Sequence, residues 1–183
     1  MLGKQAIDLG ALDGMRRPEL TAFKRRVLDA HDQLTLEWCG VQRRYHAAMM
    51  RTVLVGEPAA EQVAMHAACE AALTACEATI RPGATMGAVF DAHAGVLDDA
   101  GYRDIRLNAC GYGMGAVYAP IWVDWPMLYH GNPLTFAADQ VYFLHMILLD
   151  LDAHRAMTLG HSVRVTDTGV ERLSRSPLDL VVR

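Results

Sequence analysis

A histidine in an apolar run and a glutamate in an alternating run have the clearest potential for acid–base chemistry. His145 lies in VYFLHMILL, residues 141–149. Its imidazole can act as a general base near neutral pH without a metal, although a histidine among apolar residues is also typical of a hydrogen-bonded core position. Glu37 alternates with Leu36 and Trp38 and so faces away from them. Its carboxylate is either solvent-facing or able to orient and charge-pair the imidazole.

A tyrosine and an arginine have the chemistry to bind a polar substrate. Tyr112 lies in a glycine-rich turn expected over residues 108–115, where its phenol could donate a hydrogen bond to an oxyanion or could simply pack. Arg51 could bind a substrate carboxylate through its planar guanidinium, or could pair with an acidic side chain at the surface. Both alternatives stay open for each residue.

The elements that must position these residues begin with two strands. Residues 34–40 alternate between apolar and polar types, and residues 45–55 form a second run that ends at Gly-Glu-Pro. The short connection over residues 40–43 predicts that the two strands form a hairpin.

Helices are predicted on both sides of that hairpin. A helix is expected over residues 17–30, an Ala-rich helix over 58–80, and another that Thr85 caps and Gly101 ends. Two further strands are expected over 141–150 and 156–166. Helices on one face of a mainly antiparallel sheet give an α+β fold.

Composition excludes several classes of partner. The chain has 183 residues, 52% of them hydrophobic and 21% charged, as in a globular domain that can bury a sizeable core. A net charge of -4 argues against nucleic acid, which requires clustered Lys and Arg. The longest apolar stretch, 141–149, is too short to cross a bilayer. We therefore expect one domain over residues 1–183 that binds neither nucleic acid nor a membrane.

The spacing of the cysteines and the composition of the first ten residues indicate the cellular compartment. Cysteines 39, 69, 76 and 110 show no CxxC spacing, which favours buried thiols in a reducing compartment over a zinc knuckle or a disulfide framework. Residues 1–10 contain Lys4 and Asp8 and no apolar core of a signal peptide. These features predict a cytoplasmic protein.

Five segments, in order, resemble one enzyme superfamily. They are YHAAMMRTVLVGEP (45–58), ATIRPGATMGAVFDAHAGVLDDAGY (78–102), GYGMG (111–115), VYFLHMILL (141–149) and GHSVRVTDTGVERLSR (160–175). Together they are similar to the pita-bread catalytic domain shared by creatinase, methionine aminopeptidase, aminopeptidase P and prolidase. The resemblance covers about residues 34–176 and implies a curved antiparallel sheet with helices on one face. Only 36 residues precede Glu37, so it also implies a domain truncated at its N-terminus, without the first of two repeats.

The resemblance implies five metal-ligand positions: two Asp, one His and two Glu that hold a pair of divalent ions. In this chain these positions are occupied, in sequence order, by Glu37, Ala48, Tyr112, His145 and Gly160. Alanine and glycine side chains offer no donor atom, and the remaining three do not supply a dinuclear ligand set. We therefore expect no metal and no other cofactor.

The same frame brings further residues to one cavity. It implies that His145 and Glu37 are catalytic and that Tyr112, His46, Arg51 and His161 bind substrate. The expected function is a metal-independent, creatinase-like or Xaa-Pro-peptidase-like hydrolase or lyase that acts on a small polar C–N-type substrate. The alternatives are a catalytically inactive homologue that serves as a binding protein or subunit, and a truncated remnant that needs a partner.

The resemblance also predicts assembly. Without a first repeat, strand edges and an apolar packing face would be exposed, and such features recruit another chain. A symmetric homodimer or a larger oligomer is expected, with its interface in the first 40 residues or in residues 118–133.

Overall fold

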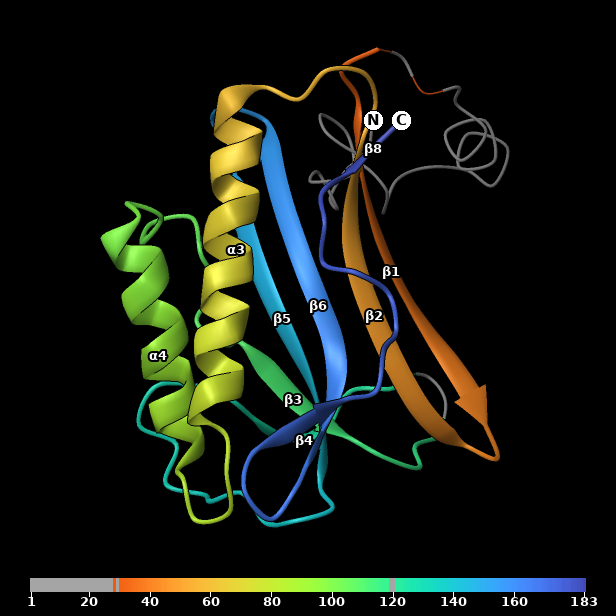
Figure 1. Ribbon diagram of the computed structural model, residues 1–183, viewed down its shortest axis with the longest axis vertical. Helices are drawn as coiled ribbons and strands as arrows, with labels where there is room; N and C mark the ends of the chain where they lie inside the picture. The colour runs from red at the N-terminus through yellow and green to blue at the C-terminus, as the bar shows by residue number, and fades with distance from the viewer. Residues whose placement is uncertain (1–27, 29, 119–120) are drawn as a thin grey trace, which may run out of the picture.

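The computed structural model describes residues 28, 30–118 and 121–183, and shows a curved sheet with two helices packed on one face (Figure 1). The helix expected over 17–30 falls almost entirely outside the described residues. The strands are β1 (Gln33–Gln42), β2 (Tyr45–Leu54), β3 (Gly111–Met114), β4 (Asp124–Met127), β5 (Val141–Asp150), β6 (Arg155–Val165), β7 (Val170–Arg172) and β8 (Val181–Val182), and the helices are α3 (Ala60–Thr79) and α4 (Met86–Asp99). The expected α+β, pita-bread-like class is confirmed.

The predicted hairpin is present as β1 and β2. Its turn is shorter than expected and consists of Arg43 and Arg44, which both have positive φ angles of 50° and 73°. Such a two-residue turn matches the right-handed twist of the flanking strands and fixes their register. Glu37 is therefore paired with Met50, and Leu36 and Trp38 lie on the other face of the hairpin.

The helices form because their apolar positions recur on one side. α3 buries Cys69, Leu73 and Cys76 against the sheet, and β5 contributes Leu144 and Met146 to the same core. The predicted cap of α4 is confirmed, since the Thr85 hydroxyl accepts a hydrogen bond from the Ala88 N–H at 3.2 Å. Within the described part of the chain, neither helix has the length and apolar content needed to span a membrane.

The sheet has the order β1-β2-β6-β5-β3-β4, and β8 runs parallel to β2. It curls at the end where the β1–β2 turn lies. There the segment after β3 reaches β2, with the His46 N–H donating to the Gly115 carbonyl at 3.1 Å and the Val117 N–H to the Arg44 carbonyl at 3.2 Å. The curl gives the sheet a concave face that points away from the helices.

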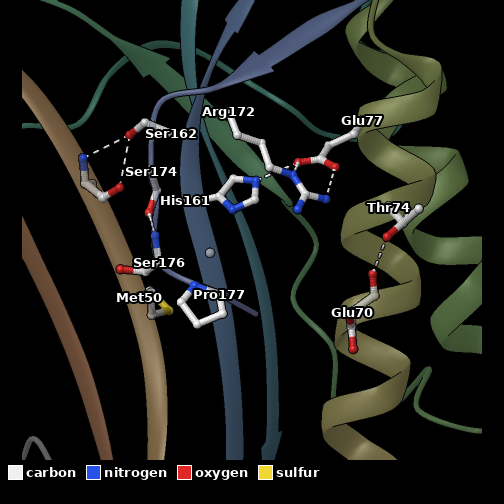
Figure 2. Close-up of polar contacts among 12 residues, drawn as sticks. Met50, Glu70, Thr74, Glu77, His161, Ser162, Arg172, Ser174, Ser176 and Pro177 are labelled. Atoms are coloured by element: carbon white, nitrogen blue, oxygen red, sulfur yellow. Dashed lines mark hydrogen bonds and ion pairs between the residues drawn. The ribbon is translucent and has the colours of Figure 1, made fainter. Parts of the chain in front are cut away.

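A charged network ties α3 to the sheet (Figure 2). The Glu77 carboxylate lies 2.6 Å from His161 Nε2 on β6 and accepts two hydrogen bonds from Arg172 on β7, at 2.8 and 2.6 Å. Burial raises the pKa of Glu77, but the bonds from His161 and Arg172 outweigh it and hold that pKa below its ordinary value.

Replacing Glu77 with Ala should destabilise the protein by about 1–3 kcal/mol, because the His161 ring would lose its acceptor inside the protein. Urea unfolding followed by circular dichroism measures this change. Val63→Ala is the control, because Val63 is 47% exposed on the same helix and lies outside the network. Equal losses in the two variants would contradict a stabilising role for the network.

Candidate active site

Four side-chain positions form one row across the concave face. Glu37 is paired with Met50, Met50 with Gly160, and Gly160 with His145, so the row crosses β1, β2, β6 and β5. Directly opposed residues of antiparallel strands project to the same face. The sheet therefore brings Glu37 and His145 to one face although 107 residues separate them in the sequence.

Glu37 and His145 do not touch. β2 and β6 lie between them, which corresponds to about 14 Å between their backbones in a flat sheet. Among the described residues, no hydrogen bond or ion pair joins the two side chains, so the expected charge pair is not formed. Glu37 is exposed on the edge strand, and partial burial of its carboxyl raises its pKa.

His145 is enclosed by aromatic rings. Its ring centroid lies 5.7 Å from that of Tyr112 and 5.9 Å from that of Phe143, and the residue is 6% exposed. Nδ1 is buried with no hydrogen-bond partner among the described residues. Burial lowers the pKa of His145 to about 4. The imidazole is therefore neutral at physiological pH.

Tyr112 is oriented by a tryptophan. The Trp122 indole N–H donates to the Tyr112 hydroxyl oxygen at 3.0 Å. Burial and, to a smaller extent, the charge of Glu37 raise the pKa of Tyr112 to about 12, despite this bond. The phenol thus stays protonated, and its own O–H remains available to donate. The sequence reveals the aromatic character of residue 122 but not this contact, because the residue lies in an irregular segment.

His46 lies on the same face, at the curled end of the sheet. Val41 is its partner on β1, and His46 Nδ1 lies 3.3 Å from the Gly115 carbonyl oxygen. Beside it a groove of about 670 Å³ is lined by Val41, His46, Gly115, Val141 and Leu173, among others. The expected placement of His46 on the face of residue 48 agrees with the strand register.

Two of the expected substrate-binding residues lie elsewhere. His161 faces α3 and binds Glu77, because it is the neighbour of Gly160 and alternate residues of a strand face opposite sides (Figure 2). Arg51 is likewise on the helix side, where Nη1 donates to the Gly160 carbonyl at 2.7 Å and Nη2 to the Pro177 carbonyl at 3.1 Å. The expectation that they share a cavity with His145 is wrong for this reason.

The positions that the family resemblance assigns to metal ligands do not fit a metal. A Cβ atom added to Gly160 would lie 2.6 Å from the Leu144 carbonyl oxygen and 2.8 Å from the Phe143 ring, so that ring occupies the space a longer side chain would need. Ala48 is fixed through its backbone, which exchanges hydrogen bonds of 2.9 and 3.0 Å with the Ser162 hydroxyl. Across the described residues, no three His, Cys, Asp or Glu side chains gather as metal ligands would. Sequence analysis did not identify Phe143 as a residue of the site, because an apolar strand gives no signal that tells a site-lining ring from a core ring.

A second histidine is buried, lacks hydrogen-bond partners among the described residues and has a lowered pKa, as His145 does. His93 on α4 is 0% exposed, and neither of its ring nitrogens has a hydrogen-bond partner among the described residues. Burial, with a smaller contribution from the charge of Arg106, lowers its pKa to about 4. The folded protein therefore resists protonation of both rings.

Acidification should destabilise the fold, because the unfolded chain binds protons at these histidines from about pH 6.5 downward and the folded chain does not until about pH 4. The unfolding free energy should fall by on the order of 2 kcal/mol per histidine between these limits. Urea unfolding near pH 7 and near pH 4.5 tests this linkage. His93→Leu should flatten the dependence, whereas exposed His154→Asn should leave it unchanged; an unaltered slope in the first variant would disprove the assignment.

The chain is similar to known proteins over most of its length. Residues 16–170 match metallopeptidase family M24. A protein of Sinorhizobium fredii described as an uncharacterized hydrolase/peptidase is 32% identical over 163 residues, which are 88% of this chain and 40% of that protein. The ectoine hydrolase of Halomonas elongata is 29% identical over 147 residues, which are 80% of this chain and 36% of the enzyme.

The fold is also that of a solved peptidase. The crystal structure of dipeptidase PepE from Mycobacterium ulcerans superimposes with a TM-score of 0.79 at 24% identity, over 86% of this chain and 41% of that one. The chain thus spans less than half the length of each of these proteins. The match over residues 16–170 shows that the chain belongs to the M24 metallopeptidase family.

Proposed function

We propose that this chain is a metal-independent hydrolase or lyase of the M24 family that acts on a C–N bond of a small polar molecule. The proposal is supported mainly by the residues that occupy the positions which the resemblance assigns to metal ligands. Ala48 and Gly160 supply no donor, the Phe143 ring fills the space beside Gly160, and a neutral histidine remains in the row. The similarity to an ectoine hydrolase supports a small substrate rather than a protein.

The reaction requires only groups that the chain itself provides. In hydrolysis, His145 takes a proton from a water molecule as its oxygen bonds to the substrate carbon, and the same proton is then given to the leaving nitrogen as the C–N bond breaks. The Tyr112 O–H donates to the oxygen that gains negative charge, and Trp122 holds the phenol in place. Development of negative charge beside the ring favours the imidazolium form, which counteracts the effect of burial.

Glu37 and His46 are assigned to substrate binding. Glu37 is too far from His145 to orient the imidazole, but its carboxylate lies on the same face and suits a cationic nitrogen of the substrate. His46 lines the groove at the curled end. Arg51 and His161 are assigned to the framework, because their donors are engaged by carbonyl groups and by Glu77.

One observation favours a second function. Tyr112, Phe143 and His145 pack against one another with centroid distances of 5.3–5.9 Å, as side chains of a filled core do. A catalytically inactive homologue that binds a small ligand at the groove beside His46 would need no more than this arrangement.

We further propose that residues 1–183 act as one domain, in the cytoplasm, as a homodimer.

Activity and metal content decide between the two functions. Purified protein, dialysed against a chelator, is assayed with small N-acyl amino acids, ureido acids and cyclic amidines, and its metal is measured by elemental analysis. Hydrolysis should persist in the chelator, and His145→Gln should lower kcat/KM by about 10²–10⁴-fold. The matched control is His154→Asn, since His154 is exposed in the turn between β5 and β6.

Three results would count against the proposed reaction. Stoichiometric manganese, zinc, cobalt or iron that survives dialysis would contradict metal independence. An unchanged rate in His145→Gln would remove the general base. Binding of a compound from the panel without turnover would establish the inactive homologue instead.

Replacing Gly160 with Ala should destabilise the protein by about 1–3 kcal/mol, because the new methyl group would collide with the Leu144 carbonyl and the Phe143 ring. Thermal and urea unfolding measure the loss. Gly169→Ala is the control, since nothing lies within 4 Å of its added Cβ. A neutral Gly160→Ala would mean that the space for a ligand side chain is still open.

A further inference from the structure

The role proposed for His145 requires that its ring be held in one tautomer. A neutral imidazole has one N–H and one lone pair, and a general base must present the lone pair to the substrate. Nδ1 of His145 is the fully buried nitrogen, so Nε2 is the nitrogen that can meet a substrate on the concave face. Nε2 offers a lone pair only when Nδ1 carries the proton. That buried N–H requires an acceptor, and Glu37, which β2 and β6 separate from His145, is too distant to provide it.

The backbone ladder beside His145 contains a bulge. The segment that connects α4 to β3 contacts the edge of β5 at two points, where the Leu149 N–H donates to the Ile105 carbonyl at 2.8 Å and the His145 N–H to the Cys110 carbonyl at 2.9 Å. The segment advances one residue more than β5 between these points, which is the arrangement of a β-bulge, and bulges are typical of sheet margins next to active sites. The Ile147 N–H points to the same edge, and among the described residues no backbone hydrogen bond across that edge involves it.

His93 lies beside the bulged segment on the helix side of the sheet. It is 0% exposed on α4, and its ring centroid is 5.5 Å from that of Phe90, over which Arg106 of the segment also lies, with its guanidinium carbon 5.5 Å from the ring centroid. The charge of His145 contributes to the lowering of the pKa of His93, as expected of neighbouring rings. In the described part of the chain, three buried side-chain nitrogen or oxygen atoms lack a partner, and all three belong to these two histidines.

We propose that a buried water molecule bridges His145 Nδ1 and one ring nitrogen of His93. Buried polar groups are almost always bonded to protein or to ordered water, and a buried water requires about two to four polar neighbours. His145 donates its Nδ1 proton to the water oxygen, and the water donates to the lone pair of the neutral His93 ring. The Ile147 N–H at the bulge is a further donor.

This link makes His93 a positioning residue for the proposed reaction, on which the inference rests. With its Nδ1 proton held by the water, His145 keeps the Nε2 lone pair directed at the substrate. The opposite polarity, with His93 as the donor, would place the proton on Nε2 and leave no base on the concave face. His93 acts through the water and does not touch the substrate, because α4 lies on the other side of the sheet (Figure 1).

Heteronuclear NMR of the histidine rings tests the tautomer without an activity assay. Protonated and unprotonated ring nitrogens have distinct chemical shifts, and His145→Gln identifies the signals of His145 by their loss. Near neutral pH we expect the wild-type proton on Nδ1, with a rotating-frame Overhauser contact between that proton and water. His93→Leu removes the acceptor, so the proton should move to Nε2, where solvent accepts it. His93→Gln should keep the proton on Nδ1, because the amide oxygen still accepts from the water.

Val89→Ala is the matched control, because Val89 is 0% exposed on the same helix and its truncation weakens the core without removing a polar group. It should leave the tautomer unchanged. With a substrate from the panel above, His93→Leu should lower kcat by about 10–100-fold with little change in KM. His93→Gln should restore most of that loss.

A wild-type proton on Nε2, or no contact between the Nδ1 proton and water, would overturn the inference even if His93→Leu does not fold. The same tautomer in the wild type and in folded His93→Leu would overturn it too. The NMR result is independent of turnover. Absence of activity on the whole panel would therefore count against the proposed reaction, whereas turnover with an unaltered tautomer in His93→Leu would count against the water link alone.

Discussion

The short junction between β2 and β6 holds the two parts of the sheet together. Only three residue pairs form it, from Met49–His161 to Arg51–Leu159. Polar side chains extend it in both directions: the Ser162 hydroxyl bridges the backbone of Ala48, and the Thr52 hydroxyl accepts from the Thr158 N–H at 2.8 Å. β2 and β6 stand between Glu37 and His145 in the sheet, so this junction sets the spacing of the two side chains in the candidate site.

Gly160 lies at the centre of that junction and links packing to chemistry. The Leu144 backbone and the Phe143 ring approach so closely that a side chain has no room there. Where the family resemblance implies a metal ligand, this chain has a close strand contact backed by an aromatic ring. The same contact places Phe143 beside Tyr112 and His145, and burial keeps the imidazole neutral. The crowding at Gly160 and the burial of the His145 ring are thus two aspects of one packing arrangement.

The polar side chains on the helix side of the sheet have a structural role. Arg51 donates to carbonyl groups of Met50, Gly160 and Pro177, and thereby clamps the C-terminal segment onto the hairpin. Glu77 joins α3 to β6 and β7. These buried polar groups hold the sheet to its surroundings, and their burial reflects a structural role rather than access to a ligand. A buried charge is costly unless its hydrogen bonds are satisfied, and here they are.

The sequence by itself predicted the hairpin, the helices α3 and α4 and the strands β5 and β6, because alternation and caps are local signals that follow the periods of strand and helix. The family followed from the resemblance of five short motifs in order. Residues 108–115 were expected to form a turn, but the structure places strand β3 within them. Only the tertiary structure decided which residues meet. The assignment of His161 and Arg51 to the cavity failed because one step along a strand reverses the face. The contact of Trp122 with Tyr112 and the filling of the space beside Gly160 by Phe143 depend on strand register and on chain segments distant in sequence, which no local pattern encodes.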